Sequence, residues 1–234
     1  MFKSFVFCVK IILIWVLLVP LNREAFATQI DAPGIQDKLL LNAAKEGHTK
    51  DILEALSLGA FINTKGEHDL TPLHFAARSG HIEAIKCLLC AGADIKAKNK
   101  NANTPLHSAA YGDKTPAIAL LVEKGADLNA RNSDGDSPLH SAAWKNNPDA
   151  IETLSIKGAN LEAKNNEGDT PLHLAAWNNS VLAISSLLAL GAQINAKNND
   201  GSTPLDLAIQ KNNHAAISMI RDFMATPTII TISS

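Results

Sequence analysis

The chain has 234 residues, of which 46% are apolar, 19% charged and only 5% aromatic. Apart from the shortage of aromatic residues, this composition is ordinary for a soluble globular protein. The formal net charge of −2 supplies no basic stripe, so the sequence predicts no nucleic-acid partner.

Residues 1–27 have the features of a secretory signal peptide. Two lysines accompany an apolar run over residues 11–19, and the small residues Ala25 and Ala27 mark a cleavage site. The run is too short for a membrane-spanning helix, which needs about 20 apolar residues. We therefore favour cleavage and export, which predicts a secreted or periplasmic protein. An uncleaved segment that anchors the chain in a membrane is the alternative.

Residues 28–35 form a short leader, and residues 36–70 hold an incomplete copy of a repeat that becomes regular at Thr71. The incomplete copy keeps the paired alanines, Ala43 and Ala44, but lacks the tetrapeptide Thr-Pro-Leu-His. A terminal unit has one face in water and is therefore expected to be atypical. Residues 36–70 are predicted to be an N-terminal cap.

From Thr71 onward the chain repeats itself every 33 residues. The tetrapeptide, or a close variant of it, starts at residues 71, 104, 137, 170 and 203. Paired alanines follow at a constant offset, and then an isoleucine and a Gly-Ala pair in the regular copies. Such a period indicates stacked modules, each of which buries its apolar face against its neighbours.

Each copy predicts two helices. In the first, a threonine caps the helix and the proline takes the first helical position, where its missing N–H costs nothing. Leu73, Ala76 and Ala77 then lie at i, i+3 and i+4 and form a narrow apolar stripe. A second stripe with this spacing starts at Ile85, and Gly92 ends the second helix. The polar segments that follow are rich in Asn, Asp and Gly, which favours hairpin turns.

The 33-residue period and the pattern T-P-L-H-x-A resemble the ankyrin repeat. The resemblance implies an all-α repeat protein, a solenoid of about six helix-turn-helix units with β-hairpin loops. Four regular units would occupy residues 71–202, a C-terminal cap residues 203–224 and a tail residues 225–234. Asp206 and Met224 replace the usual His and Gly in the last unit, which suits a cap.

In ankyrin repeats the Thr and His of the tetrapeptide form local hydrogen bonds and tie adjacent units together. The resemblance therefore implies a structural role for Thr71, His74, Thr104, His107, His140, Thr170 and His173. A metal site at the histidines is disfavoured, because neighbouring units lie roughly 8–10 Å apart. Two imidazoles on one zinc ion must each bring a nitrogen to about 2 Å. We predict neither a metal nor a cofactor.

No motif in the sequence predicts catalysis: a G-x-S-x-G elbow, a phosphate-binding loop and H-E-x-x-H are all missing. Cys87 and Cys90 form C-x-x-C, but the repeat places both in the middle of a second helix rather than at a helix N-terminus, where a thiolate would be stabilised. We predict that the protein is not an enzyme. An accessory or redox factor that uses the two cysteines is a less favoured alternative.

One variable position follows the paired alanines, and its aromatic residues are not needed to complete the apolar stripe. In the ankyrin family this helix end and the loop tips line a concave groove that binds protein partners, and Trp, Tyr and Arg are common in interface hot spots. The later loop tips are acidic, so a basic partner surface would be complementary. The resemblance implies partner contacts at Arg78, Tyr111, Trp144, Lys145, Trp177, Asn178, Asp134, Asp136, Glu167 and Asp169.

Taken together, these features predict an exported ankyrin-repeat scaffold that binds another protein through its concave face. A membrane-tethered version of the same module is the alternative if residues 1–27 are retained.

Overall fold

The computed structural model describes residues 34–225, which contain twelve α-helices and no β-strand. The predicted signal peptide lies outside the described residues, as do most of the leader and of the tail. The helices follow one another in pairs, with a short 3₁₀ turn, η1 (Glu67–Asp69), after the first pair. The pairs are α2 (Ile35–Glu46) and α3 (Thr49–Ser57), α4 (Pro72–Ser79) and α5 (Ile82–Cys90), α6 (Pro105–Tyr111) and α7 (Thr115–Glu123), α8 (Pro138–Trp144) and α9 (Pro148–Ile156), α10 (Pro171–Trp177) and α11 (Val181–Ala189), and α12 (Pro204–Gln210) and α13 (His214–Ala225).

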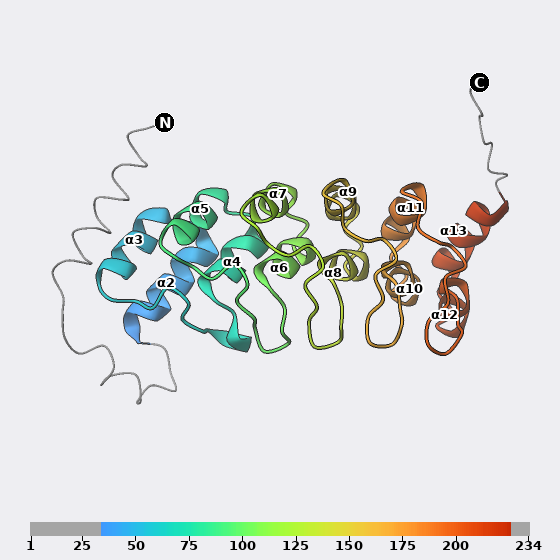
Figure 1. Cartoon of the computed structure of the whole chain (residues 1–234), viewed down its shortest axis with the longest axis horizontal. Coiled ribbons are helices and arrows are strands. Elements are labelled where there is room, and N and C mark those ends of the chain that lie inside the picture. The colour runs from blue at the N-terminus through green and yellow to red at the C-terminus, as the bar shows by residue number, and fades with distance from the viewer. Residues whose placement is uncertain (1–33, 226–234) are drawn as a thin grey trace, which may run out of the picture.

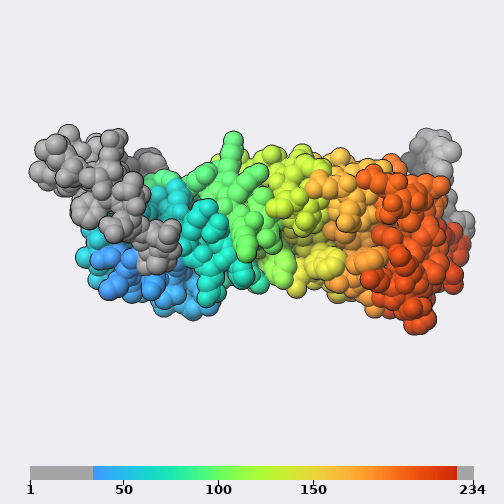
Figure 2. Space-filling view, turned by 90° about the horizontal axis from the view of Figure 1, so that it is seen from below, coloured from blue at the N-terminus to red at the C-terminus, as the bar shows by residue number. Residues whose placement is uncertain are grey.

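The pairs stand in single file and form two rows of helices. The first helix of each pair lies in an inner row, the second lies in an outer row, and the loops extend from the inner row away from the outer one (Figure 1). Each inner helix packs against the inner helices of the adjacent pairs, as α6 does against α4 and α8. The units follow one another along the molecule in chain order (Figure 2). The fold is thus an all-helical repeat with a core that runs along its length.

The core consists of the apolar stripes that the repeat predicts. In α6 and α7 the side chains of Leu106, Ala109, Ala110, Ile118 and Leu121 are completely buried. The equivalent residues of the neighbouring units join the same continuous cluster. Because alanine is small, the inner helices approach closely and leave little room for aromatic side chains in the core. This packing accounts for the low aromatic content of the chain.

The last helix differs in length from the other outer helices. α3, α5, α7, α9 and α11 each have nine residues and are followed by a glycine at positive φ, such as Gly125 (φ 90°). At the corresponding place Met224 replaces glycine, and α13 continues for 12 residues to Ala225. A left-handed glycine ends a helix and methionine does not, so the substitution explains the longer helix.

The loops are tight turns rather than paired strands. In one of them the Asn132 N–H donates to the Asp136 carbonyl oxygen at 3.0 Å, and Gly135 takes a left-handed conformation (φ 79°). Ala102, which stands where later copies have glycine, adopts it too (φ 58°). Adjacent loops share one backbone hydrogen bond, as between Ser133 N–H and the Asn101 carbonyl. A single bond per neighbour does not make a strand ladder, so the predicted β-hairpins have no strands within residues 34–225.

Truncation of a buried outer-helix residue tests this packing. The change Ile118→Ala should lower the free energy of unfolding by roughly 2–5 kcal/mol, because Ile118 is completely buried and the cavity would not refill. Urea unfolding followed by circular dichroism measures the loss. The matched control is Ile156→Ala on α9, where the side chain is 73% exposed and the change should stay within about 0.5 kcal/mol. Equal losses for the two variants would contradict the packing described.

Candidate functional site

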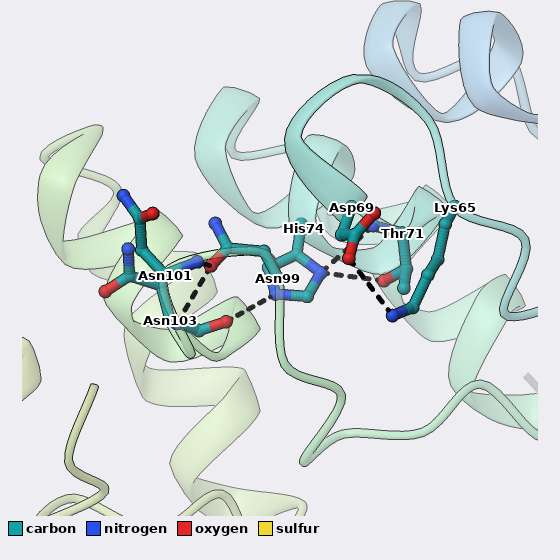
Figure 3. A network of polar contacts seen from close by, with 7 residues as sticks. All are labelled: Lys65, Asp69, Thr71, His74, Asn99, Asn101 and Asn103. Atoms are coloured by element: carbon teal, nitrogen blue, oxygen red, sulfur yellow. Dashed lines mark hydrogen bonds and ion pairs between the residues drawn. The ribbon is translucent and has the colours of Figure 1, made fainter. Parts of the chain in front are cut away.

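A buried histidine links the start of each regular inner helix to the loop of the next unit. His74 lies between Thr71 and Asn103, with Nδ1 2.8 Å from the threonine hydroxyl and Nε2 2.9 Å from the Asn103 carbonyl oxygen (Figure 3). The Thr71 backbone N–H also donates to Nδ1 at 3.2 Å. Since Nδ1 accepts from an N–H, the proton is on Nε2, which donates to the carbonyl. His74 therefore connects the first helix of its own unit to the loop of the next.

The same arrangement recurs in the following units. The Nε2 atoms of His107, His140 and His173 each lie 3.0 Å from a carbonyl oxygen of the next loop, in Asp136, Asp169 and Ser202 respectively. Burial lowers the pKa of all four motif histidines, and it lowers the pKa of His107 and of His140 to about 4. The histidines are therefore neutral at pH 7 and hold the loops at a fixed distance from the inner helices.

Side-chain amides fix the other end of the inner helices. The Asn147 Nδ2 donates to the Tyr111 carbonyl oxygen at 2.9 Å, across one unit boundary. Analogous bonds join Asn178 to the Trp144 carbonyl at 2.7 Å and Asn213 to the Trp177 carbonyl at 2.8 Å. These carbonyls lie at helix C-termini, where no intrahelical partner is available. The aromatic residues are thus anchored through their own backbone.

A second set of contacts joins each connecting turn to the next outer helix. Asp113 has a positive φ of 55°, and its Oδ1 accepts from the Ala150 N–H, in the first turn of α9, at 2.9 Å. The same contact joins Asn146 to Ala183 and Asn179 to Ala216. A side chain of one unit therefore supplies a partner for an N–H group that the next helix leaves unsatisfied.

Three aromatic residues end three successive inner helices. Tyr111 is the last residue of α6, Trp144 of α8 and Trp177 of α10. Tyr111 and Trp144 are each 38% exposed, whereas Trp177 is half-buried. None of the three belongs to the buried core cluster. They follow the paired alanines at the position where the sequence predicts partner contacts.

A groove runs beside two of these rings, between the inner helices and the loops. It has a volume of about 560 Å³. Of the predicted contact residues, five line it: Tyr111, Trp144, Asp134, Asp136 and Glu167. The aromatic rings come from the ends of α6 and α8, and the carboxylates come from two successive loops. The groove is thus lined by aromatic rings from the helix ends and by carboxylates and amides from the loops.

Other predicted residues lie outside the lining and act on the rings instead. The Arg78 guanidinium lies 4.8 Å, and the Lys145 Nζ 4.4 Å, from the centre of the Tyr111 ring. Trp177 is covered by Lys211, whose Nζ lies 3.7 Å from the ring centre. Asn178 holds the Trp144 backbone, as described above. Tyr111 and Trp177 of the predicted ladder thus each carry a cation of the chain.

Asp169 is not part of the exposed surface, contrary to the expectation for the loop tips. It is only 6% exposed, and its Oδ1 accepts from the Asn198 Nδ2 at 2.8 Å. The equivalent Asp136 accepts from the Asn165 Nδ2 at 2.9 Å. Burial raises the pKa of Asp136, and the nearby carboxylates of Asp134 and Asp169 raise it further against that hydrogen bond. Asp169 is buried and Asp136 half-buried, because each carboxylate bonds an asparagine of the next loop.

Several residues that line the groove were not predicted from the sequence. Ser141 of α8 and Leu174 of α10 follow the motif histidine directly, and this position varies between units. That variation was the available signal. The asparagines of the loops could not be predicted in this way, because asparagine is also present there to form the turns. The additional amide residues in the lining are Asn101, Asn103, Asn132, Asn165 and Asn166.

The other groups of residues considered for chemistry, the cysteine pair and possible metal ligands, do not line the groove. Cys87 and Cys90 lie in the last turn of α5, with Cys90 its final residue, rather than in the middle of the helix as predicted. Neither is at a helix N-terminus, where a thiolate gains stabilisation. Residues 34–225 contain no group of three His, Cys, Asp or Glu side chains arranged for a metal ion. Over the same residues, no helix combines the length and the apolar character that crossing a membrane requires.

A comparison with protein families matches nearly the whole chain. The model described as ankyrin repeats in three copies matches residues 17–99, 40–132, 88–165 and 139–228. A search of curated proteins finds no significant match.

The lowered pKa values of the histidines predict a loss of stability in acid. Unfolded histidines take up protons near pH 6.5, but folded His107 and His140 do so only near pH 4. Between these values the unfolded state binds more protons, so stability is full above pH 6.5 and falls as the pH falls. At pH 5 the loss should be on the order of 2 kcal/mol for each of these two histidines.

Urea unfolding at pH 7 and pH 5 measures this loss. The raised pKa of Asp136 acts in the opposite direction, but it is one carboxyl group against four histidines. As a control, the exposed His214 can be changed by His214→Gln, which should leave the pH dependence as it was. Equal free energies of unfolding at the two pH values would show that the buried histidines are not neutral.

Proposed function

Because the chain belongs to the ankyrin-repeat family, whose repeats are in general protein-interaction modules, we propose that it is a non-enzymatic scaffold that binds another protein through the groove. The groove is the concave face between the inner helices and the loops. The proposal is carried by the partly exposed rings of Tyr111 and Trp144 on the groove wall, outside the buried core. Aromatic rings so placed supply large contact areas at little cost in conformational entropy.

The groove is held in one shape by the contacts between units. The histidine bonds fix the loops against the inner helices, and the asparagine bonds fix the backbone at the rings. A partner therefore meets a surface that is already ordered, which reduces the entropy lost on binding. The loop amides and carboxylates supply the polar selectivity.

The six helix pairs are six repeat units in this proposal, with caps at residues 36–70 and 203–224. Residues 1–27 act as a cleaved signal peptide, which gives a secreted or periplasmic protein. Support comes from the lysines, the short apolar run and the small residues of that segment. Intact-mass measurement of the exported chain tests this, because retention of residues 1–27 would favour the membrane-tethered alternative.

Affinity capture with the chain, followed by mass spectrometry, identifies candidate partners, and calorimetry then measures their affinity. Trp144→Ala should weaken binding of a true partner by about 2 kcal/mol or more, because it removes a central aromatic anchor. Trp177→Ala should weaken it less, because that ring is half-buried under Lys211.

The matched control for these variants is Leu182→Ala. Leu182 is 56% exposed but lies on α11, in the outer row. Its truncation should leave both affinity and fold unchanged. Unchanged affinity in a folded Trp144→Ala variant would place the binding surface elsewhere.

A further inference from the structure

Two of the three aromatic rings already hold a cation of this chain. Arg78 and Lys145 lie over the Tyr111 ring, and Lys211 lies over the Trp177 ring. Within residues 34–225 no Lys or Arg side chain lies over the ring of Trp144, although this ring is as exposed as that of Tyr111. The middle ring of the series is therefore the one that lacks a cation.

The difference has a simple cause in the sequence. The lysine over a ring comes from the residue that follows the ring position in the next unit, which is Lys145 for Tyr111 and Lys211 for Trp177. Arg78, the second cation over Tyr111, stands at the ring position of the preceding unit, where Trp144 has the neutral Tyr111. For Trp144 the residue that follows the ring position in the next unit is Asn178. Its side chain turns to the backbone, where Nδ2 donates to the Trp144 carbonyl oxygen at 2.7 Å. A neutral residue thus stands where the neighbouring units have a lysine.

The loops that line the groove contribute negative charge to it and no basic residue. The groove lining includes Asp134, Asp136 and Glu167 and no lysine or arginine. None of the ion pairs formed by the described part of the chain includes these carboxylates. Arg131, whose charge acts on Asp136, is held by the Lys164 carbonyl and the Asn166 side chain. The groove is therefore complementary to a positive charge.

We propose that the groove binds an extended segment of the partner that places an arginine or lysine side chain on the Trp144 ring, facing Asp134, Asp136 and Glu167. This inference rests on the proposed function, because the cation belongs to the protein that the groove binds. The groove volume of about 560 Å³ lies within the range that is typical of ligand-binding pockets. Arginine fits better than lysine, because its planar guanidinium stacks on an indole and pairs with carboxylates.

Selection of peptides tests the proposal without knowledge of the natural partner. The full chain is used to select binders from a library of random dodecapeptides, and binders that lose affinity for the Trp144→Ala variant are kept. These peptides should be enriched in arginine and lysine. Replacing the critical arginine by citrulline, a neutral residue of similar shape, should weaken binding roughly fivefold or more.

A second variant supplies the missing cation from within the chain. Asn178→Lys places a lysine where Lys145 and Lys211 stand in the other units, so it should compete with the peptide and weaken binding by a similar factor. Asn178→Gln is the neutral comparison: it changes the residue that bonds the Trp144 carbonyl without adding a charge, so Asn178→Lys should weaken binding more than Asn178→Gln does, and equal losses would contradict competition by the lysine. The tryptophan fluorescence and thermal melt of both variants check that the fold is kept.

The contrary outcomes separate this inference from the proposed function. Peptides that require Trp144 but lack a cation, or that tolerate citrulline, would overturn the inference and leave the groove as the binding site. If all peptides that bind the parent chain also bind the Trp144→Ala variant equally, so that none is kept, both the inference and the proposed function would be overturned.

Discussion

The hydrogen bond from each motif histidine to the loop of the next unit is the interaction on which the rest of the structure depends. It has an imidazole Nε2–H as donor and a backbone carbonyl as acceptor, about 3 Å apart in all four copies. Because the ring is buried, the bond does not compete with water, and loss of either partner would leave a buried polar group unsatisfied. It sets the spacing between the inner helices and the loops, and that spacing is the width of the groove.

The polar contacts between units also explain why the groove presents its aromatic residues so directly. An aromatic side chain inside the stack would have to replace an alanine, and the close approach of the inner helices leaves no room for it. At the end of an inner helix the constraint is lifted. Tyr111 and Trp144 can project there while asparagines of the next unit satisfy their carbonyl oxygens. The same helix end therefore satisfies its backbone and exposes a ring, which is how a uniform scaffold carries a variable surface.

Much of this architecture could be predicted from the sequence, because the same local residue pattern recurs in each copy of the repeat. The helix pairs and the buried stripes were predictable from Pro72, Leu73, Ala76 and their equivalents, since period and spacing determine which face is buried. The Thr-His contacts were implied by the resemblance to ankyrin repeats. The side-chain partners that join residues across a unit boundary could not be predicted from the sequence. Nothing in the sequence distinguishes Asn178, which holds a backbone carbonyl, from an asparagine in a turn. Nor does the acidic character of Asp169 reveal that it is buried between loops.

The way in which Asp113, Asn146 and Asn179 each cap the outer helix of the following unit has a consequence for how the chain can change in length. These three boundaries are thus joined by equivalent atoms, whereas Gly80 stands at the same position one unit earlier and offers no side chain. Duplication or loss of one of the units that these three boundaries join would therefore leave this contact between units unchanged. Such a change would lengthen or shorten the row of helix pairs. Along the groove, only the order of the aromatic and charged side chains would change.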